Sequence, residues 1–289
     1  MKNLLYGILF LALVGIVFAA CEKNGITIDN VYDDFVEKSD EFIQDFEFDN
    51  SIDGAKKVRW YDWVAIAAAD GMSGLGGAKL AMTIFPPYGS IAGAILGGGV
   101  GSYTMWLEIT GNSAPPPPSG GHNVPPINFK NQYEVVGTKH NELMSTLIKE
   151  NLPSDPGILY DFIIHHDGFV DVFSDKMKLI EFTRKFTKSM LKNQMENASI
   201  IDLKNGQTIK DFILENYRLK RINKNQKLIL DYYVDVVIRI KDVKQVSEYS
   251  IFCENFIMRS RLNSQEKKEI LVFFTTFRYS INFWSNDKL

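Results

Sequence analysis

Two apolar stretches follow one another in the first half of the chain, over residues 63–85 and 88–107. The second stretch contains no charged side chain. Pro86 and Pro87 separate the two, and consecutive prolines end a helix because they lack a backbone N–H donor and clash with the preceding turn. The pattern therefore predicts a hairpin of two helices over residues 59–110.

Small residues recur at four-residue spacing in both stretches. They are Gly89, Gly93, Gly97 and Gly101 in the second stretch and Ala69, Ser73, Gly77 and Ala81 in the first. Residues four apart share one face of a helix, so each arm presents a stripe with little or no side chain. We therefore expect a glycine zipper, along which the arms or partner helices approach closely.

The hairpin has two interpretations, insertion in a bilayer or burial in the protein. Aromatic residues at the ends of the stretches suit a membrane interface. They are Trp60, Tyr61, Trp63, Tyr88, Tyr103 and Trp106. Asp70 and Lys79 argue for burial in the protein, because they point to opposite sides of a helix and each costs roughly 2.5–3.5 kcal/mol at a bilayer centre. The sequence leaves both interpretations open.

The rest of the chain predicts an all-α protein with a separate linker. Residues 21–58 read as an acidic tether followed by an amphipathic helix over 29–46, and residues 111–128 as a Pro/Gly-rich linker. Residues 129–289 read as a multi-helix domain. Its expected helices cover residues 132–151, 158–166, 174–197, 208–219, 224–249 and 264–284.

The N-terminus predicts export. Lys2 precedes an apolar run over residues 4–18, and small Ala19 and Ala20 precede Cys21, which together indicate a signal peptide over residues 1–20. Residues 17–21 resemble a bacterial lipobox, in which the cysteine is lipidated and becomes the mature N-terminus. The resemblance implies a lipid anchor at Cys21 in a membrane of the cell envelope, the outer rather than the inner. The alternative is a soluble secreted protein in which Cys21 has no such role.

Charge and cysteine content narrow the possible partners. The formal net charge is -3, and neither half of the chain has the basic excess of a nucleic-acid-binding protein. Cys253 is the only cysteine besides Cys21 and follows the apolar residues Ile251 and Phe252, so we expect a buried free thiol.

Candidate chemistry is sparse. The chain has no HExxH, GxSxG or phosphate-binding loop, so we predict a non-enzymatic protein with no cofactor, no metal and no catalytic residue. The best polar site is His140, Asn141 and Glu142 with His165 and His166. Tertiary contact among these histidines would make a metal-dependent hydrolase, which is a minor alternative. The other interpretation is that the histidines and Asn141 tie the helix to a neighbouring loop by hydrogen bonds.

Two resemblances shape the functional hypotheses. Tyr133, Val136-Gly137 and the stretch from His140 to Leu143 resemble a motif in uncharacterised bacterial secreted and lipoprotein families with a Gly-rich region upstream, which implies no activity. Residues 88–107 are similar to the transmembrane helices of class II bacteriocins. The leading hypothesis is an envelope lipoprotein whose hairpin mediates membrane insertion, self-association or other helix pairing, in bacterial antagonism or immunity. The alternative is a helical binding module for another envelope component, with the hairpin as its packed core.

Overall fold

The computed structural model describes residues 29–46, 48, 60–84, 89–110, 125–153, 155–165, 181–182, 185, 208–240 and 242–285. Within these ranges every regular element is a helix, which confirms the predicted all-α class. The predicted signal peptide, Cys21, most of the predicted linker, Tyr88 and His166 lie outside the described residues. The helices are α2 (Asp29–Ile43), α3 (Trp60–Ile84), α4 (Gly89–Thr110), α5 (Glu134–Glu150), α6 (Pro156–His165), α9 (Ile209–Arg218), α10 (Lys224–Arg239), α11 (Val243–Arg259) and α12 (Ser264–Trp284).

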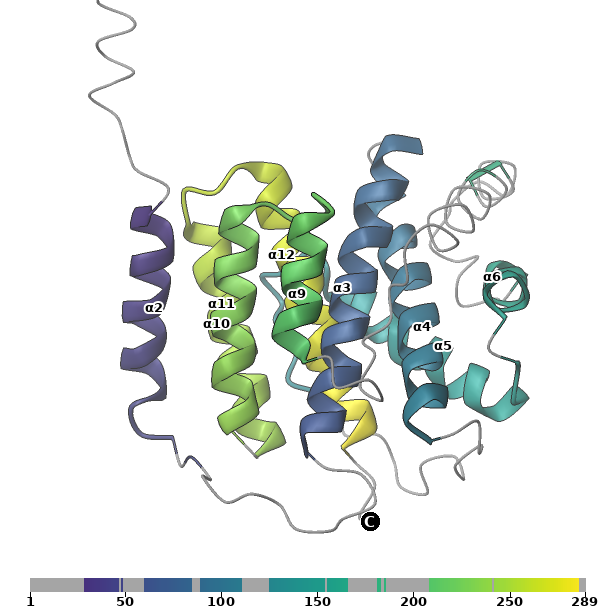
Figure 1. Ribbon diagram of the computed structural model, residues 1–289, viewed down its shortest axis with the longest axis horizontal. Helices are drawn as coiled ribbons and strands as arrows, with labels where there is room; N and C mark the ends of the chain where they lie inside the picture. The colour runs from purple at the N-terminus through teal and green to yellow at the C-terminus, as the bar shows by residue number, and fades with distance from the viewer. Residues whose placement is uncertain are drawn as a thin grey trace, which may run out of the picture.

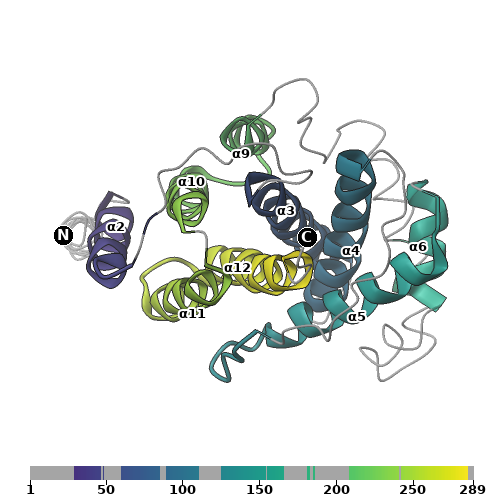
Figure 2. The same ribbon diagram turned by 90° about the horizontal axis from the view of Figure 1, so that it is seen from below.

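Most of the helices run side by side along one direction, with α2 at one edge of the molecule and α6 at the other (Figure 1). Seen end-on, α12 lies in the middle, and α3, α4, α5, α10 and α11 all pack against it (Figure 2). Every residue of α12 from Glu269 to Trp284 is buried. A helix that is buried on all sides belongs to the interior of a bundle, and α12 is therefore the axis of this fold.

The two arms of the hairpin touch along their small-residue stripes. A Cβ atom added to Gly77 would lie 2.0 Å from the carbonyl oxygen of Gly93, and one added to Gly97 would lie 2.2 Å from that of Ser73. Any side chain at these positions would push the backbones apart. The small-residue stripes of α3 and α4 thus pack against each other within one chain.

The opposite face of α3 packs against α12. A Cβ atom on Gly71 would lie 2.7 Å from the Cδ2 atom of Phe273, so the aromatic ring rests directly on the α3 backbone. Across the part of the chain that the structure describes, every helix falls short of the length and apolar character that a bilayer crossing needs.

The hairpin and the C-terminal helices share one hydrophobic core. Trp63 of α3 and Trp106 of α4 both stack with Trp284 of α12, at centroid distances of 6.2 and 5.8 Å. Tyr103 of α4 donates a hydrogen bond to the carbonyl of Leu152, at 2.6 Å. These aromatic side chains near the hairpin ends therefore contact other parts of the protein.

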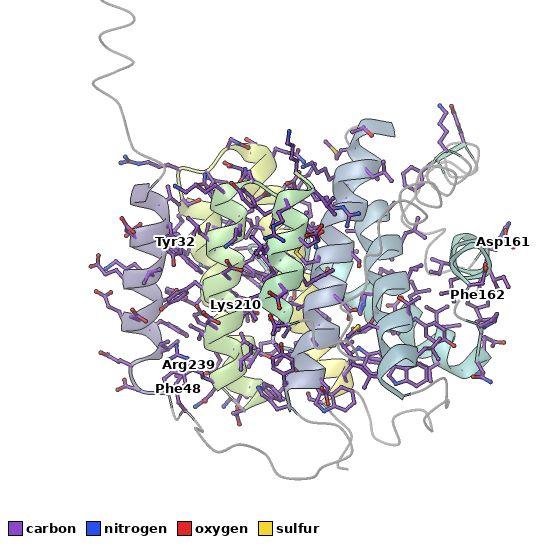
Figure 3. The ribbon with its side chains drawn as sticks, in the orientation of Figure 1. Tyr32, Phe48, Asp161, Phe162, Lys210 and Arg239 are labelled. Atoms are coloured by element: carbon purple, nitrogen blue, oxygen red, sulfur yellow. The ribbon has the colours of Figure 1, made fainter. Side chains whose placement is uncertain are left out.

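Helix α2 closes the other side of the bundle. Phe35 is fully buried and packs against Tyr232 of α10 and Phe256 of α11. Phe42 stacks on Phe252 with ring centroids 4.4 Å apart. Arg239 lies over the ring of Phe48 just beyond the helix (Figure 3). The amphipathic helix predicted over residues 29–46 thus covers α10 and α11.

One predicted helix is wrong. The expected helix over residues 224–249 is two helices, because the chain turns between Arg239 and Val243. Asp242 starts the second helix by accepting a hydrogen bond from the backbone N–H of Gln245, at 2.7 Å. The helix predicted over residues 264–284 has those bounds, with Asn263 as its N-cap. Most of the helix expected over residues 174–197 lies outside the described residues.

Candidate functional site

A small polar cluster lies inside the apolar core, where α3, α4, α5 and α12 meet. Asp70 of α3 and His140 of α5 are both fully buried, and His140 Nε2 lies 3.5 Å from Asp70 Oδ2. Ser102 of α4 donates a hydrogen bond to the same carboxyl oxygen at 2.7 Å, and Ser280 of α12 also donates to it. Trp284 Nε1 donates to Ser102 Oγ at 3.2 Å. Four helices therefore meet through one carboxyl group.

Two glycines make room for this cluster. A Cβ atom on Gly98 of α4 would lie 3.3 Å from His140 Cδ2, so a larger residue there would press on the imidazole. A Cβ atom on Gly137 of α5 would lie 2.1 Å from Tyr279 Cδ2, which leaves space for hydrogen alone. The close approach of α5 to α12 at Gly137 helps to place His140 in the core.

Burial shifts both ionisable groups toward their uncharged forms. Desolvation raises the pKa of Asp70 well above its ordinary value, although the hydrogen bonds from Ser102 and Ser280 oppose this. Desolvation lowers the pKa of His140 to about 4, and the hydrogen bond with Asn141 opposes it. The cluster is therefore better described as neutral, hydrogen-bonded groups than as a buried ion pair.

Part of the hydrogen-bonding capacity in this cluster is unused. Four buried atoms have no hydrogen-bond partner in the described part of the chain, namely Asp70 Oδ1, His140 Nε2, Ser73 Oγ and Thr276 Oγ1. Each such buried atom costs about 1–3 kcal/mol. Burial of these polar atoms therefore lowers the stability of the core.

A second polar network surrounds Arg278 of α12, whose side chain is also fully buried. Its Nε donates to Glu254 of α11 at 3.1 Å, and its Nη2 donates to Glu134 of α5 at 2.6 Å. Its Nη1 donates to the carbonyl of Pro126 at 2.5 Å. Desolvation raises the pKa of Glu254, although Arg278 opposes the shift. One guanidinium therefore ties α5, α11 and the segment before α5 to the central helix.

The structure separates the histidines that the sequence grouped. His140 contacts Asp70 and hydrogen-bonds with Asn141, which also donates to the carbonyl of Tyr279 at 3.2 Å. Asn141 thus hydrogen-bonds to the helix α12 rather than to a neighbouring loop, and Nδ1 of His140 bonds within α5. Glu142 points outward and pairs with Lys139 at 2.7 Å.

His165 lies on the exposed side of α6. Its Nδ1 is 2.7 Å from the carbonyl oxygen of Asp161, a residue that faces away from the bundle in Figure 3. Its side chain is 74% exposed, whereas that of His140 is enclosed. Within the described ranges, no three His, Cys, Asp or Glu side chains are arranged to hold a metal ion.

Sequence reasoning missed most of the buried polar residues. Asp70 was noted only as a cost of membrane insertion, and Arg278 was not singled out. Both stand as the single charged residue in an otherwise uncharged helical stretch, over residues 63–78 and 270–284. A lone charge in an apolar helix is the signal that could have identified them, because such a charge is buried only with a partner.

The cluster is built for holding helices together. Ser102 and Ser280 donate to Asp70 rather than to His140, so among the described residues no hydroxyl is paired with the imidazole as a nucleophile is with its base. Asp70, Ser102, His140 and Ser280 are all fully buried, which leaves a substrate no contact with them.

Comparison with protein-family models, curated proteins and solved structures gives no match for this chain.

Proposed function

We propose that this protein is a lipid-anchored, non-enzymatic helical module of the bacterial cell envelope that binds another envelope component, with the Gly-rich hairpin as its packed core. The observation that carries the proposal is the contact between the two small-residue stripes. Gly77, Gly93 and Gly97 face backbone of the opposite arm, so the surface that a partner helix would need is already occupied.

The Asp70 cluster supports the same function. It joins the hairpin to α12 by hydrogen bonds from Ser280 to Asp70 and from Trp284 to Ser102, and it places Asp70 against His140 of α5. Arg278 of α12 adds hydrogen bonds to Glu254 of α11 and Glu134 of α5. A module held in this way presents its outer helix faces and turns to a partner, while its central helices stay fixed.

Lipid attachment at Cys21 would hold this module at the envelope, at the outer rather than the inner membrane. Mass spectrometry of the protein from its membrane fraction should find acyl chains on Cys21. The Cys21→Ser variant should appear in the soluble fraction. An unmodified Cys21 in membrane-free protein would make the protein a soluble secreted one.

The hairpin part of the proposal is tested on residues 22–289 without lipid. We expect this protein to stay soluble without detergent and its hairpin to resist protease. It should release no dye from lipid vesicles. Gly76→Leu serves as the matched control for Gly97→Leu, because a Cβ at Gly76 meets no described atom within 4 Å.

Membrane insertion of the hairpin is the second candidate function. It is favoured by the raised pKa of Asp70, because a neutral carboxyl costs less to move into lipid than a charged one. Dye release by the unmodified protein and by Gly76→Leu, with loss of release in Gly97→Leu, would support insertion and antagonism or immunity. The same result would remove the packed-core proposal.

A further inference from the structure

Several chain turns meet at one end of the bundle, which is the upper end in Figure 1. The α9–α10 turn, the α11–α12 turn, the end of α3 and the start of α2 all lie there. Asn223 Nδ2 donates to Glu266 Oε1 at 2.6 Å, and Lys79 Nζ donates to the carbonyl of Arg221 at 2.9 Å. We call residues 215–227 and 259–269 at this end the basic end.

The basic end carries an excess of positive charge. It contains nine basic and three acidic side chains. The basic ones are Arg218, Lys220, Arg221, Lys224, Lys227, Arg259, Arg261, Lys267 and Lys268. Residues 40–46 and 239–248, at the opposite end of the bundle, contain three basic and five acidic side chains. Asp29, Asp33 and Asp34 at the start of α2 also lie at the basic end, where basic side chains still outnumber acidic ones, whereas acidic side chains outnumber basic ones at the opposite end.

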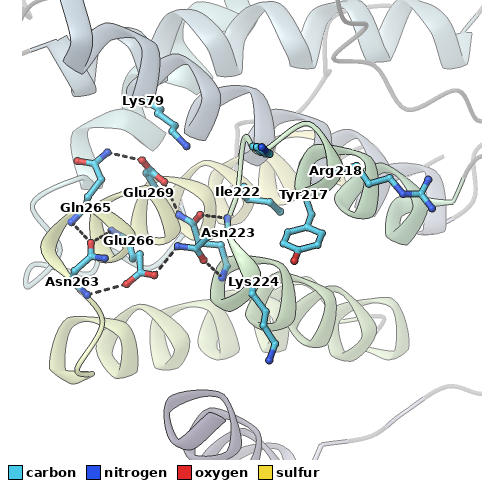
Figure 4. Close-up of a pocket in the computed structure, with 12 residues that line it drawn as sticks. Lys79, Tyr217, Arg218, Ile222, Asn223, Lys224, Asn263, Gln265, Glu266 and Glu269 are labelled. Carbon is cyan, nitrogen blue, oxygen red and sulfur yellow. Dashed lines mark hydrogen bonds between the residues drawn. The ribbon is translucent and has the colours of Figure 1, made fainter. Parts of the chain in front are cut away.

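Two of the carboxylates at the basic end are occupied by amide groups. Glu266 accepts from Asn223 and from the backbone N–H of Asn263. Glu269 is buried and accepts from Gln226 at 2.6 Å and from Gln265 at 2.5 Å. In Figure 4 Arg218 and Lys224 extend away from this network. These two carboxylates therefore hold the turns together, whereas the third, Glu215, pairs with Arg218, whose Nη1 lies 3.6 Å from Glu215 Oε2.

Exposed apolar side chains alternate with the basic ones at this end. Tyr217 is 38% exposed and Leu219 is 40% exposed, with Arg218 and Lys220 as their exposed neighbours. Lys220 has a φ of 56°, which turns the chain sharply after α9. An amphipathic aromatic ring and an aliphatic side chain among Lys and Arg suit a lipid surface, where apolar groups enter the headgroup layer and cations meet phosphates.

A pocket lies directly beside these side chains. It has a volume of about 590 Å³, and Lys79, Arg218, Lys220 and Lys224 are among its lining residues (Figure 4). Glu266 and the buried Glu269 also line this pocket, so basic groups outnumber carboxylates four to two, an excess that suits an anionic headgroup.

The length of the segment between Cys21 and α2 indicates which end of the bundle faces the membrane. Seven residues separate Cys21 from Asp29, the first residue of α2. Such a segment spans at most about 28 Å. A lipid on Cys21 would therefore hold the start of α2, and with it the basic end, close to the bilayer.

We infer that the basic end docks on the anionic phospholipid surface of the membrane, with Tyr217 and Leu219 in the headgroup layer and Arg218, Lys220 and Lys224 on the phosphates. This inference deepens the proposed function and takes its orientation from the proposed anchor at Cys21. It leaves the acidic end of the bundle, including the α10–α11 turn, facing away from the membrane toward a partner.

The test uses residues 22–289, which lack the lipid, in sedimentation with vesicles. We expect binding to vesicles of phosphatidylcholine mixed with phosphatidylglycerol and none to phosphatidylcholine alone. Raising the salt concentration should weaken this binding, because headgroup attraction is screened. The Arg218→Glu and Lys220→Glu double variant should bind at least about tenfold more weakly.

The control reverses two basic residues at the opposite end, Arg239→Glu with Lys244→Glu, and should bind as the unmodified protein does. Circular dichroism checks that both double variants are folded. Equal binding to the two vesicle types, no binding to either, or equal loss in the control variant would overturn the inference. Acylation of Cys21 is read separately by mass spectrometry, so failure of the docking surface is distinguished from failure of the anchor.

Discussion

His140 Nε2 lies 3.5 Å from Asp70 Oδ2, and neither side chain has any exposed surface. The two residues are 70 positions apart in the chain and belong to different predicted segments, the hairpin and the C-terminal helices. Their contact joins these segments inside the core. It also places two groups with opposite pKa shifts side by side, so the stability of the fold should depend on pH in a specific way.

The pH dependence is tested with Asp70→Asn. The lowered pKa of His140 contributes stability that is present above pH 6.5 and is lost as the pH falls toward about 4. The raised pKa of Asp70 has the opposite effect, because the stability that it contributes to the fold is present at acid pH and is lost as the pH rises. Asp70→Asn leaves the His140 contribution alone, so its free energy of unfolding should fall by roughly 3 kcal/mol between neutral pH and pH 4.

The measurement is urea unfolding of both proteins at several pH values. The difference between the two profiles cancels other groups such as Glu254. The variant should gain stability relative to the unmodified protein at alkaline pH and lose that advantage in acid. Parallel profiles would mean that Asp70 has an ordinary pKa.

The zipper predicts opposite effects for two glycines in α3 and α4. Gly97→Ala places a Cβ 2.2 Å from the carbonyl oxygen of Ser73 and should destabilise the protein by about 3 kcal/mol. Gly76→Ala meets open space and should stabilise it by up to about 1 kcal/mol through helix propensity. Thermal unfolding of the two variants measures both signs. Similar effects at the two positions would contradict the close contact of the arms.

The Arg278 network predicts strong energetic coupling between Arg278 and Glu254. Arg278→Met leaves Glu254 without its buried cation and should cost about 3–5 kcal/mol. Adding Glu254→Leu removes the uncompensated carboxylate, so the double variant should be more stable than Arg278→Met alone. A double-mutant cycle from denaturant unfolding measures the coupling. Additive losses would show that the two side chains contribute independently.

We expect the Cys253 thiol to react only when the protein unfolds. It is a free, buried cysteine, as its apolar neighbours indicated, and desolvation raises its pKa well above the ordinary value. The thiolate is the reactive form, so a disulfide reagent should modify Cys253 slowly in the native Cys21→Ser protein and rapidly in denaturant. Rapid native labelling would place Cys253 nearer the surface.

The elements of the fold could be predicted well from local patterns. The proline pair between the two apolar stretches gave α3 and α4 within a few residues, and the periodicity over residues 264–284 gave α12. These signals are local, because helix ends depend on caps and prolines near in sequence. The break between α10 and α11 escaped notice because Asp242 lies in a sequence with continuous helical periodicity.

The buried polar cluster could not be predicted, because its geometry is entirely tertiary. Nothing near Asp70 in the sequence points to His140 or Ser280, and the histidine motif suggested His165 as a partner instead. The glycine stripe gave the spacing of the zipper but not its partner, since the same stripe suits a second arm, another copy or a lipid-embedded helix.

The most direct test of a packed hairpin is amide hydrogen exchange of residues 22–289 in the absence of lipid. If α3 and α4 are the core, their central amides should exchange only with global unfolding, at the same free energy as the amides of α12. Faster exchange throughout α3 and α4, with α10, α11 and α12 still protected, would show that the hairpin opens by itself and would contradict the account.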